Sequence, residues 1–211
     1  MDVKHKTMRN LRICFFIGGL SLISFGITLS ILSNFGVGAW DTVTIGLKKH
    51  FGLTIGIWMN ICAIGFIFLG GLLNKKRPKF ECFITSLIVG IGVDFWMNIL
   101  HNLSINSIYL SLFIFLISII IISIGAGIYL VSDLPPNPID YFMMSITTRF
   151  KVNITVAKIL TESLGLLLGF IAGGPIGIGT FIMIVCFGPC IEIAYHQFHH
   201  LFRVLEAKIM I

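Results

Sequence analysis

Charged side chains are scarce in this sequence: Asp, Glu, Lys and Arg make up only 11% of its 211 residues. Apolar residues make up 56%, and the mean hydropathy is +0.99. Soluble domains carry about 25% charged residues, so the composition excludes that class and predicts a protein embedded in the lipid bilayer. The net charge of +6 does not indicate nucleic acid, because the basic residues lie in short clusters between apolar runs.

Signatures of enzymes and of bound cofactors are also missing. The chain has no His-Glu-x-x-His, no Gly-x-Ser-x-Gly, no Walker loop and no dinucleotide fingerprint, so we expect neither catalysis nor a cofactor. Five cysteines lie within or beside apolar runs and are interpreted as packing residues. Glu192, His196 and His199 or His200 have the helical spacing of metal ligands, but a histidine-rich membrane border accounts for them and no metal site is predicted.

Six apolar runs are long enough to span a bilayer, which takes about 20 helical residues. They lie at residues 12–33, 53–73, 81–100, 108–131, 153–172 and 177–197. The basic stretch from Lys4 to Arg12 resembles the start of a signal peptide, but no small-residue cleavage pattern follows, so we expect the first span to be retained. The predicted fold class is an all-α membrane protein with six transmembrane helices.

The distribution of Lys and Arg predicts the orientation, because cytoplasmic flanks of membrane helices are enriched in both. With the N-terminus inside, most of these residues fall on cytoplasmic flanks, only Lys48 and Lys49 lie outside, and Lys158 falls within a helix. We therefore expect a multi-pass protein of the bacterial inner membrane with both termini in the cytoplasm.

Two interruptions break the apolar pattern, at residues 34–41 and 132–140, and each ends on an acid. The short segment after each begins with Asp41 or Asp140 and ends near bases, which suits the helix dipole. Both segments are too short to span, so each is an interfacial or a re-entrant helix.

The two halves of the chain resemble each other, which predicts an internal repeat. At an offset of 99 the matched pairs are Asp41 with Asp140, Phe51 with Phe150, Ile55 with Ile154 and Gly70 with Gly169, and at an offset of 98 they are Gly90 with Gly188 and Asp94 with Glu192. Residues 1–100 and 101–211 then form two three-helix repeats within one integral membrane domain. An odd number of spans inserts the second repeat upside down, as in many secondary transporters.

Three motifs carry a resemblance to a known family. They are Gly36-Val37-Gly38-Ala39-Trp40-Asp41, Asn137-Pro138-Ile139-Asp140 and Gly173-Gly174-Pro175-Ile176-Gly177-Ile178-Gly179-Thr180. Along nearly its full length the chain resembles the YczE/YyaS/YitT-like family of bacterial integral membrane proteins, although Ala39 stands where related proteins often carry proline. The resemblance implies the fold rather than an activity. YitT-like members also carry a soluble C-terminal domain, and we expect functions tied to it to be absent here.

Asp41 and Asp140 are candidate ligands for a cation, a proton or an amine, with Trp40 and Asn137 beside them. The alternative interpretation is that both acids cap helices in the headgroup region, because helix starts commonly use Asp. The two interpretations remain open at this stage.

Ionisable residues inside the spans form the second group of candidates. Lys158 and Glu162 lie four positions apart on one helix face, and charges at such depth often mark a pathway, although an ion pair without further role is the alternative. Asp94 and Glu192 are candidate gating acids, or acids that reach interfacial water. Asn60 lines a cavity or hydrogen-bonds to a neighbouring helix.

These patterns together favour a transporter that moves a small solute or ion by alternating access, with Asp41, Asp140 and Glu162 as polar anchors and Lys158 as a counter-charge. Two alternatives stay open. One is a membrane regulator or scaffold that transports nothing, and the other is a substrate-binding membrane subunit of a larger transport complex. We expect a homodimer from the size of the chain, although no residue pattern establishes one.

Overall fold

Helices make up the whole regular structure of the computed structural model, which describes residues 2–103, 105 and 107–210. The elements are α1 (Asp2–Ser33), α2 (Ala39–Phe51), α3 (Ile55–Asn74), a 3-10 turn η1 (Phe80–Cys82), α4 (Phe83–Ile99), α5 (Ile108–Val131), α6 (Pro138–Phe150), α7 (Ile154–Ile171) and α8 (Ile178–Met210). Six segments, α1, α3, η1 with α4, α5, α7 and α8, are long and apolar enough to cross a membrane. The prediction of an all-α, six-span fold is confirmed.

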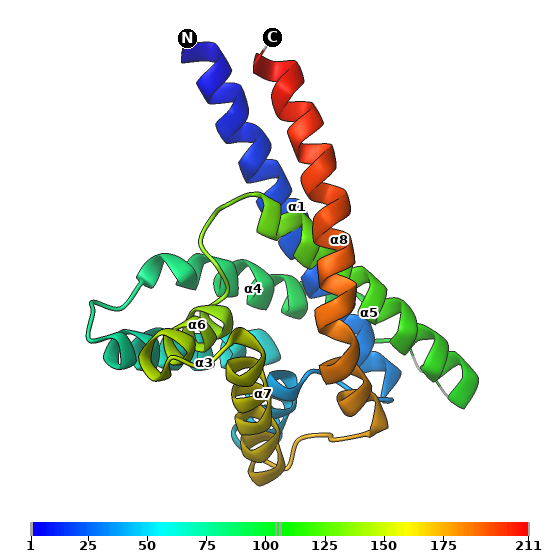
Figure 1. Cartoon of the computed structure of the whole chain (residues 1–211). Helices are drawn as coiled ribbons and strands as arrows, with labels where there is room; N and C mark the ends of the chain where they lie inside the picture. Colours follow the sequence, from blue (N-terminus) through cyan, green and yellow to red (C-terminus); the bar gives the residue numbers. More distant parts are fainter. Residues whose placement is uncertain (1, 104, 106, 211) are drawn as a thin grey trace.

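The first and last helices are longer than their apolar patterns predicted. The pattern placed them at residues 12–33 and 177–197, but α1 begins at Asp2 and α8 continues to Met210, through Pro189. Apolar patterning detects only the part of a helix that lies in the bilayer, so polar extensions are missed. Both termini lie side by side at one end of the molecule (Figure 1), and the rings of Phe15 and Phe202 meet there at 5.2 Å.

The two halves repeat the same local structure. Each long helix, α1 or α5, is followed by a residue in the left-handed region, Asn34 at φ 52° and Asp133 at φ 55°. A break follows, and then a helix of 13 residues, α2 or α6. The ion pair between Arg12 and Asp133 places the second break near the start of α1, whereas the first break follows the end of α1. The two breaks therefore begin toward opposite ends of α1 (Figure 1).

Local sequence explains where the helices begin. Asn137 caps α6 by accepting a hydrogen bond from the Ile139 N–H at 3.0 Å. Pro138 occupies the first helical position, where its lack of an N–H costs nothing because an N–H there would have no partner within the helix. Thr54 and Asn153 cap α3 and α7 in the same way. Neither Asp41 nor Asp140 is an N-cap residue, so that interpretation of the two acids is wrong in its simple form.

Small residues hold α1 against α5. A Cβ atom at Gly19 would collide with the backbone of Gly125, and one at Gly26 would collide with Ile122 and approach the Ser118 carbonyl. Such close backbone approach gains dispersion energy that lipid tails do not supply, and it explains the small residues along both helices. The α1–α5 crossing is the centre of the main core cluster.

The short helix of each half packs on a spanning helix of the other half. Helix α2 packs on α7 of the other half, where Thr42 fills the space above Gly169. Helix α6 packs on α3 in return, where Tyr141 fills the space above Gly70. Gly169 thus permits the close approach of α2 to α7. Outside these contacts the helices expose large apolar side chains, which suits contact with lipid.

We predict that Gly169→Leu destabilises the protein, because the larger side chain cannot coexist with Thr42 on α2. Overpacking of this kind costs about 1–3 kcal/mol, and thermal unfolding in detergent measures it. Gly65→Leu is the matched control, since nothing lies within 4 Å of the position of its Cβ atom. Equal melting temperatures for the two variants would contradict the close α2–α7 packing.

Candidate functional site

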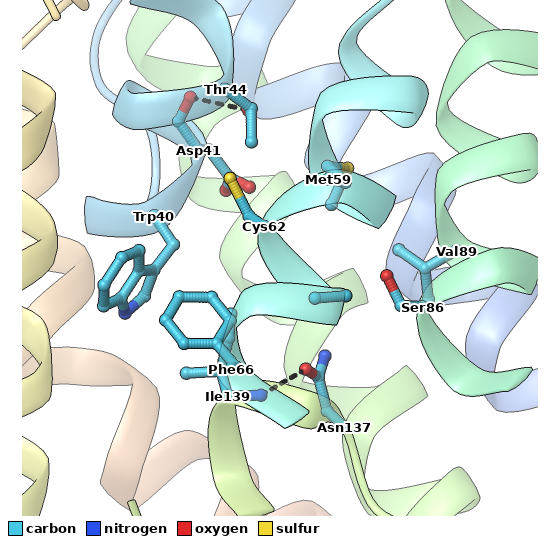
Figure 2. A pocket seen from close by; sticks show the side chains of 11 residues that line it. Trp40, Asp41, Thr44, Met59, Cys62, Phe66, Ser86, Val89, Asn137 and Ile139 are labelled. Atoms are coloured by element: carbon cyan, nitrogen blue, oxygen red, sulfur yellow. Dashed lines mark hydrogen bonds between the residues drawn. The ribbon is translucent and has the colours of Figure 1, made fainter. Parts of the chain in front are cut away.

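A small cavity lies inside the helix bundle, between the starts of the two short helices that follow the breaks (Figure 2). Its volume is about 40 Å³. It is lined by Trp40, Asp41, Thr44, Met59, Cys62, Ala63, Phe66, Ser86, Val89, Asn137 and Ile139. Since one water needs about 10–15 Å³ of such space, the cavity has room for about three waters or for one small ligand.

Both halves of the chain contribute to this cavity. Figure 2 shows Asp41 and Thr44 on one side of it and Asn137 and Ile139 on the other. The first pair belongs to α2, as does Trp40, and the second pair belongs to the break and start of α6, while α3 and α4 supply the remaining lining. Asp41, Trp40 and Asn137, which the sequence singled out as candidates, therefore meet at one cavity.

Asp41 is the one carboxylate among the lining residues. It stands in the first turn of α2, where the backbone of Gly38 donates a hydrogen bond to its side chain. Part of its surface faces the cavity, and the residue is half-buried. Burial, followed by the negative charge of Glu162, raises the pKa of Asp41 from 3.8 to about 7, against a smaller lowering by the Gly38 hydrogen bond. Asp41 therefore holds a proton, or needs a cation nearby, close to neutral pH.

Asp140 occupies the equivalent position on α6 but has a different partner. The Tyr129 hydroxyl of α5 donates a hydrogen bond to its carboxylate at 3.1 Å. Burial raises the pKa of Asp140, while the charge of Lys158 and the Tyr129 hydrogen bond oppose that rise. Asp140 is not among the residues that line the cavity of Figure 2, so the two acids do not share that space directly.

Lys158 and Glu162 form an ion pair on α7, with 3.6 Å between Nζ and Oε1. Their side chains are 37% and 19% exposed, so the pair is only partly buried. The negative charge of Glu162 raises the pKa of Asp41, and the positive charge of Lys158 lowers the pKa of Asp140. The four charged residues therefore form one electrostatically connected group of three acids and one base.

Aromatic side chains close one wall of the cavity. The rings of Trp40 and Phe66 meet edge to face at 4.5 Å, and Phe66 packs in turn on Phe142 at 5.5 Å. The Trp40 indole N–H is buried and has no hydrogen-bond partner among the described residues. A buried donor beside a cavity usually has a water or ligand as its partner, so this atom is available to a bound molecule.

Asn60 and Asp94 take part in contacts between α3 and α4. Asn60 accepts a hydrogen bond from the Ser86 hydroxyl at 3.0 Å and donates one to the Gly56 carbonyl at 2.9 Å. Asp94 binds the start of α3, whereas its repeat partner Glu192 is exposed on α8. Asn60 thus makes the interhelical hydrogen bond that was one of its two predicted roles.

Within the described part of the chain, no group of three His, Cys, Asp or Glu side chains is arranged to hold a metal ion. In the middle of α8 the ring of Tyr195 stacks on that of His199 at 5.5 Å and meets that of His196 edge to face at 6.0 Å.

Sequence reasoning missed part of the site. It did not identify Tyr129 as the partner of Asp140, or Met59, Cys62 and Phe66 as cavity residues. The internal repeat could have identified Met59, because the offset of 99 relates it to Lys158, which was already a candidate site residue. Nothing in the local sequence marks Tyr129, since a single polar tip in an apolar helix is common.

The fold and site together define a multi-pass helical membrane protein with a small cavity between two helix breaks. Residues 10–196 match a family of unknown function (DUF6198), and the chain belongs to that family. No solved structure matches it.

Three relatives cover most of the chain. It is 35% identical over 171 residues to the uncharacterized protein YyaS of Bacillus subtilis (strain 168), which covers 81% of this chain and 85% of YyaS. It is 29% identical over 199 residues to the uncharacterized membrane protein YczE of the same strain, covering 94% and 92%. An uncharacterized protein of Haemophilus influenzae is 28% identical over 173 residues, covering 82% and 78%. The resemblance to YczE/YyaS-like proteins is confirmed.

The raised pKa of Asp41 predicts a pH-dependent stability. A carboxyl whose pKa is higher in the folded state stabilises the fold fully below its ordinary value of 3.8, and this contribution is lost as pH rises through about 7. We expect the melting temperature in detergent to fall between about pH 5 and about pH 8, and Asp41→Asn to reduce that fall by at least about 4 °C. Identical pH profiles for the variant and the wild type would contradict the raised pKa.

Proposed function

We propose that this protein moves a small solute or ion across the bacterial inner membrane by alternating access between two inverted three-helix repeats. The observation that carries the proposal is the cavity of about 40 Å³ that residues of both helix breaks line. Broken helices that meet at a cavity are how many secondary transporters bind their substrates. No catalytic chemistry is needed for this function, and we propose none.

The repeat supports the inverted arrangement. Each half contains a long helix, a left-handed residue, a 13-residue helix and a spanning helix in the same order. Three spans per half invert the second copy, and the Lys and Arg distribution favours cytoplasmic termini. The first break then lies toward the outer face and the second toward the cytoplasm.

The repeat also gives the ion pair on α7 a place in the mechanism. Met59 and Ala63 of α3 line the cavity, and the offset of 99 relates them to Lys158 and Glu162 of α7. The face of α7 that corresponds to the cavity-lining face of α3 thus carries charged residues. We assign Lys158 the role of counter-charge and Glu162 that of a second acid, coupled to Asp41.

The ligand chemistry follows from the lining. The Asp41 carboxylate favours a small cation, a proton or a compact amine, and the buried Trp40 indole N–H can donate a hydrogen bond to a water or to an acceptor atom of the ligand. A volume of about 40 Å³ is too small for most metabolites in this conformation. Asp41 is the residue that binds the positive charge in this proposal.

A membrane regulator or scaffold remains the second candidate. Two contacts favour it, because Glu162 is paired with Lys158 and Asp140 with Tyr129. Paired charges of this kind stabilise assembly without any transport. The cavity with its unpaired Trp40 N–H favours transport over this alternative.

We predict saturable uptake of methylammonium, Na⁺ or K⁺, or coupled proton movement, into liposomes that contain the purified protein. Asp41→Asn, Asp140→Asn and Glu162→Gln should each reduce the rate at least about tenfold, because each removes a negative charge from the connected group. Asp133→Asn is the matched control, since the Asp133 side chain is 86% exposed outside the group. Absence of flux for every probe, together with unchanged cellular phenotypes of the three variants, would favour the scaffold.

A further inference from the structure

Helices α3 and α4 are held together at one end by an acid. The Asp94 carboxylate accepts hydrogen bonds from the Thr54 hydroxyl at 2.5 Å and from the Gly56 N–H at 2.9 Å. Gly56 and Gly90 allow the backbones to touch, because a Cβ on either residue would collide with the other's carbonyl oxygen. This set of contacts, Thr54, Gly56, Gly90 and Asp94, is called the α3–α4 contact below.

The second half has a residue of the same kind at three of the four equivalent positions, and Thr155 stands where the first half has Gly56. Offsets of 99 and 98 relate the four residues of the α3–α4 contact to Asn153 and Thr155 at the start of α7 and to Gly188 and Glu192 on α8. The starts of the two helices are built alike, because Thr54 accepts from the Ile57 N–H at 3.2 Å and Asn153 from the Val156 N–H at 2.8 Å. The second half therefore has a capped helix start, a glycine and an acid for an α7–α8 contact, namely Asn153, Gly188 and Glu192, while the Cβ of Thr155 in place of Gly56 would keep these two backbones farther apart.

That second contact is not made in this structure. Glu192 is exposed, and nothing lies within 4 Å of the position that a Cβ atom on Gly188 would take. Helix α8 packs mainly on α5 rather than on α7 (Figure 1). Two halves with matching residues thus adopt different arrangements at this one interface.

Helix packing divides the chain into two groups that meet mainly at the α3–α4 contact. Helices α1, α4, α5 and α8 pack on one another, and helices α2, α3, α6 and α7 form the second group. Between the groups, α3 against α4 is the extensive interface. A rotation of one group against the other that separates α3 from α4 would bring α7 toward α8.

We propose that Asp94 and Glu192 act as alternating gate contacts, so that Asp94 closes the α3–α4 side in this state and Glu192 closes the α7–α8 side in the other. This inference rests on the proposed transport function and names the residues that control access to its cavity. Asp94 accepts a hydrogen bond from the Gly56 amide in the first turn of α3, where the helix dipole favours a negative charge, and in the other state Glu192 would take the same place at the start of α7. Hydrogen bonds to charged groups are strong enough to bias a two-state equilibrium about tenfold.

Two matched pairs of spin labels test the exchange. Cysteines at Ile57 and Phe95 report on the α3–α4 side, and cysteines at Val156 and Ile193 are their repeat counterparts on the α7–α8 side. All four positions are exposed. The five native cysteines are first replaced by alanine. Pulsed electron spin resonance in liposomes then measures both distance distributions.

The expected result is two populations with opposite changes, one with a short 57–95 distance and one with a short 156–193 distance. Asp94→Ala should increase the second population about tenfold, and Glu192→Ala should decrease it by a similar factor. Glu206→Ala, an acid elsewhere on α8, is the control and should change neither distribution.

Gly188→Leu keeps the test decisive if Asp94→Ala fails to fold. The site has open space in the present state, so the variant should melt like the wild type, yet its side chain should block the α7–α8 contact and remove the second population. An unchanged 156–193 distribution in Gly188→Leu, Asp94→Ala and Glu192→Ala would overturn the gate. Flux without any exchange of distances refutes the gate alone, whereas exchange without flux refutes the transport function alone.

Discussion

The structure depends on satisfying the backbone of two helix breaks where lipid offers no hydrogen bonds. Other helices supply the partners. At the first break, the Phe35 carbonyl accepts from the Gly179 N–H at 3.3 Å, and the Val37 N–H donates to the Thr180 hydroxyl at 3.4 Å, both at the start of α8. At the second break, the Thr85 hydroxyl of α4 donates to the Pro135 carbonyl at 2.8 Å. Each break is therefore completed by the other half of the chain, which makes the two repeats one unit.

This mutual dependence explains which parts of the structure the sequence predicts. Apolar runs locate the six spans, and the repeated acid locates both breaks, because each signal is local. The cavity was not predictable in the same way, since it forms only where α2 and α6 cross over to α7 and α3. The different partners of Asp41 and Asp140 could not be predicted from the sequence either. Asp41 accepts a hydrogen bond from the backbone at the start of its own helix, whereas Asp140 accepts one from Tyr129 of α5.

Similar sequences in the two halves do not produce a symmetric molecule. The contacts of the short helices are reciprocal, with Thr42 on Gly169 and Tyr141 on Gly70. The α3–α4 interface is closed while its counterpart is apart. A scaffold has no physical need for such a difference between equivalent interfaces. A protein with two states related by exchange of the halves would show this difference in either state, since each state closes one face.

The charge balance of the site connects this asymmetry to the proposed transport. Three acids and one lysine share a partly buried region, and the Lys158–Glu162 pair neutralises only one acid. Two carboxylates left ionised there would be costly, so protons or a bound cation must supply the balance. In the proposed transport, the positive species that neutralises Asp41 is also the species that would be carried. Binding of this species would reduce the negative charge on the group formed by helices α2, α3, α6 and α7 before that group moves. Occupancy of the cavity would thereby be coupled to the exchange of gate contacts.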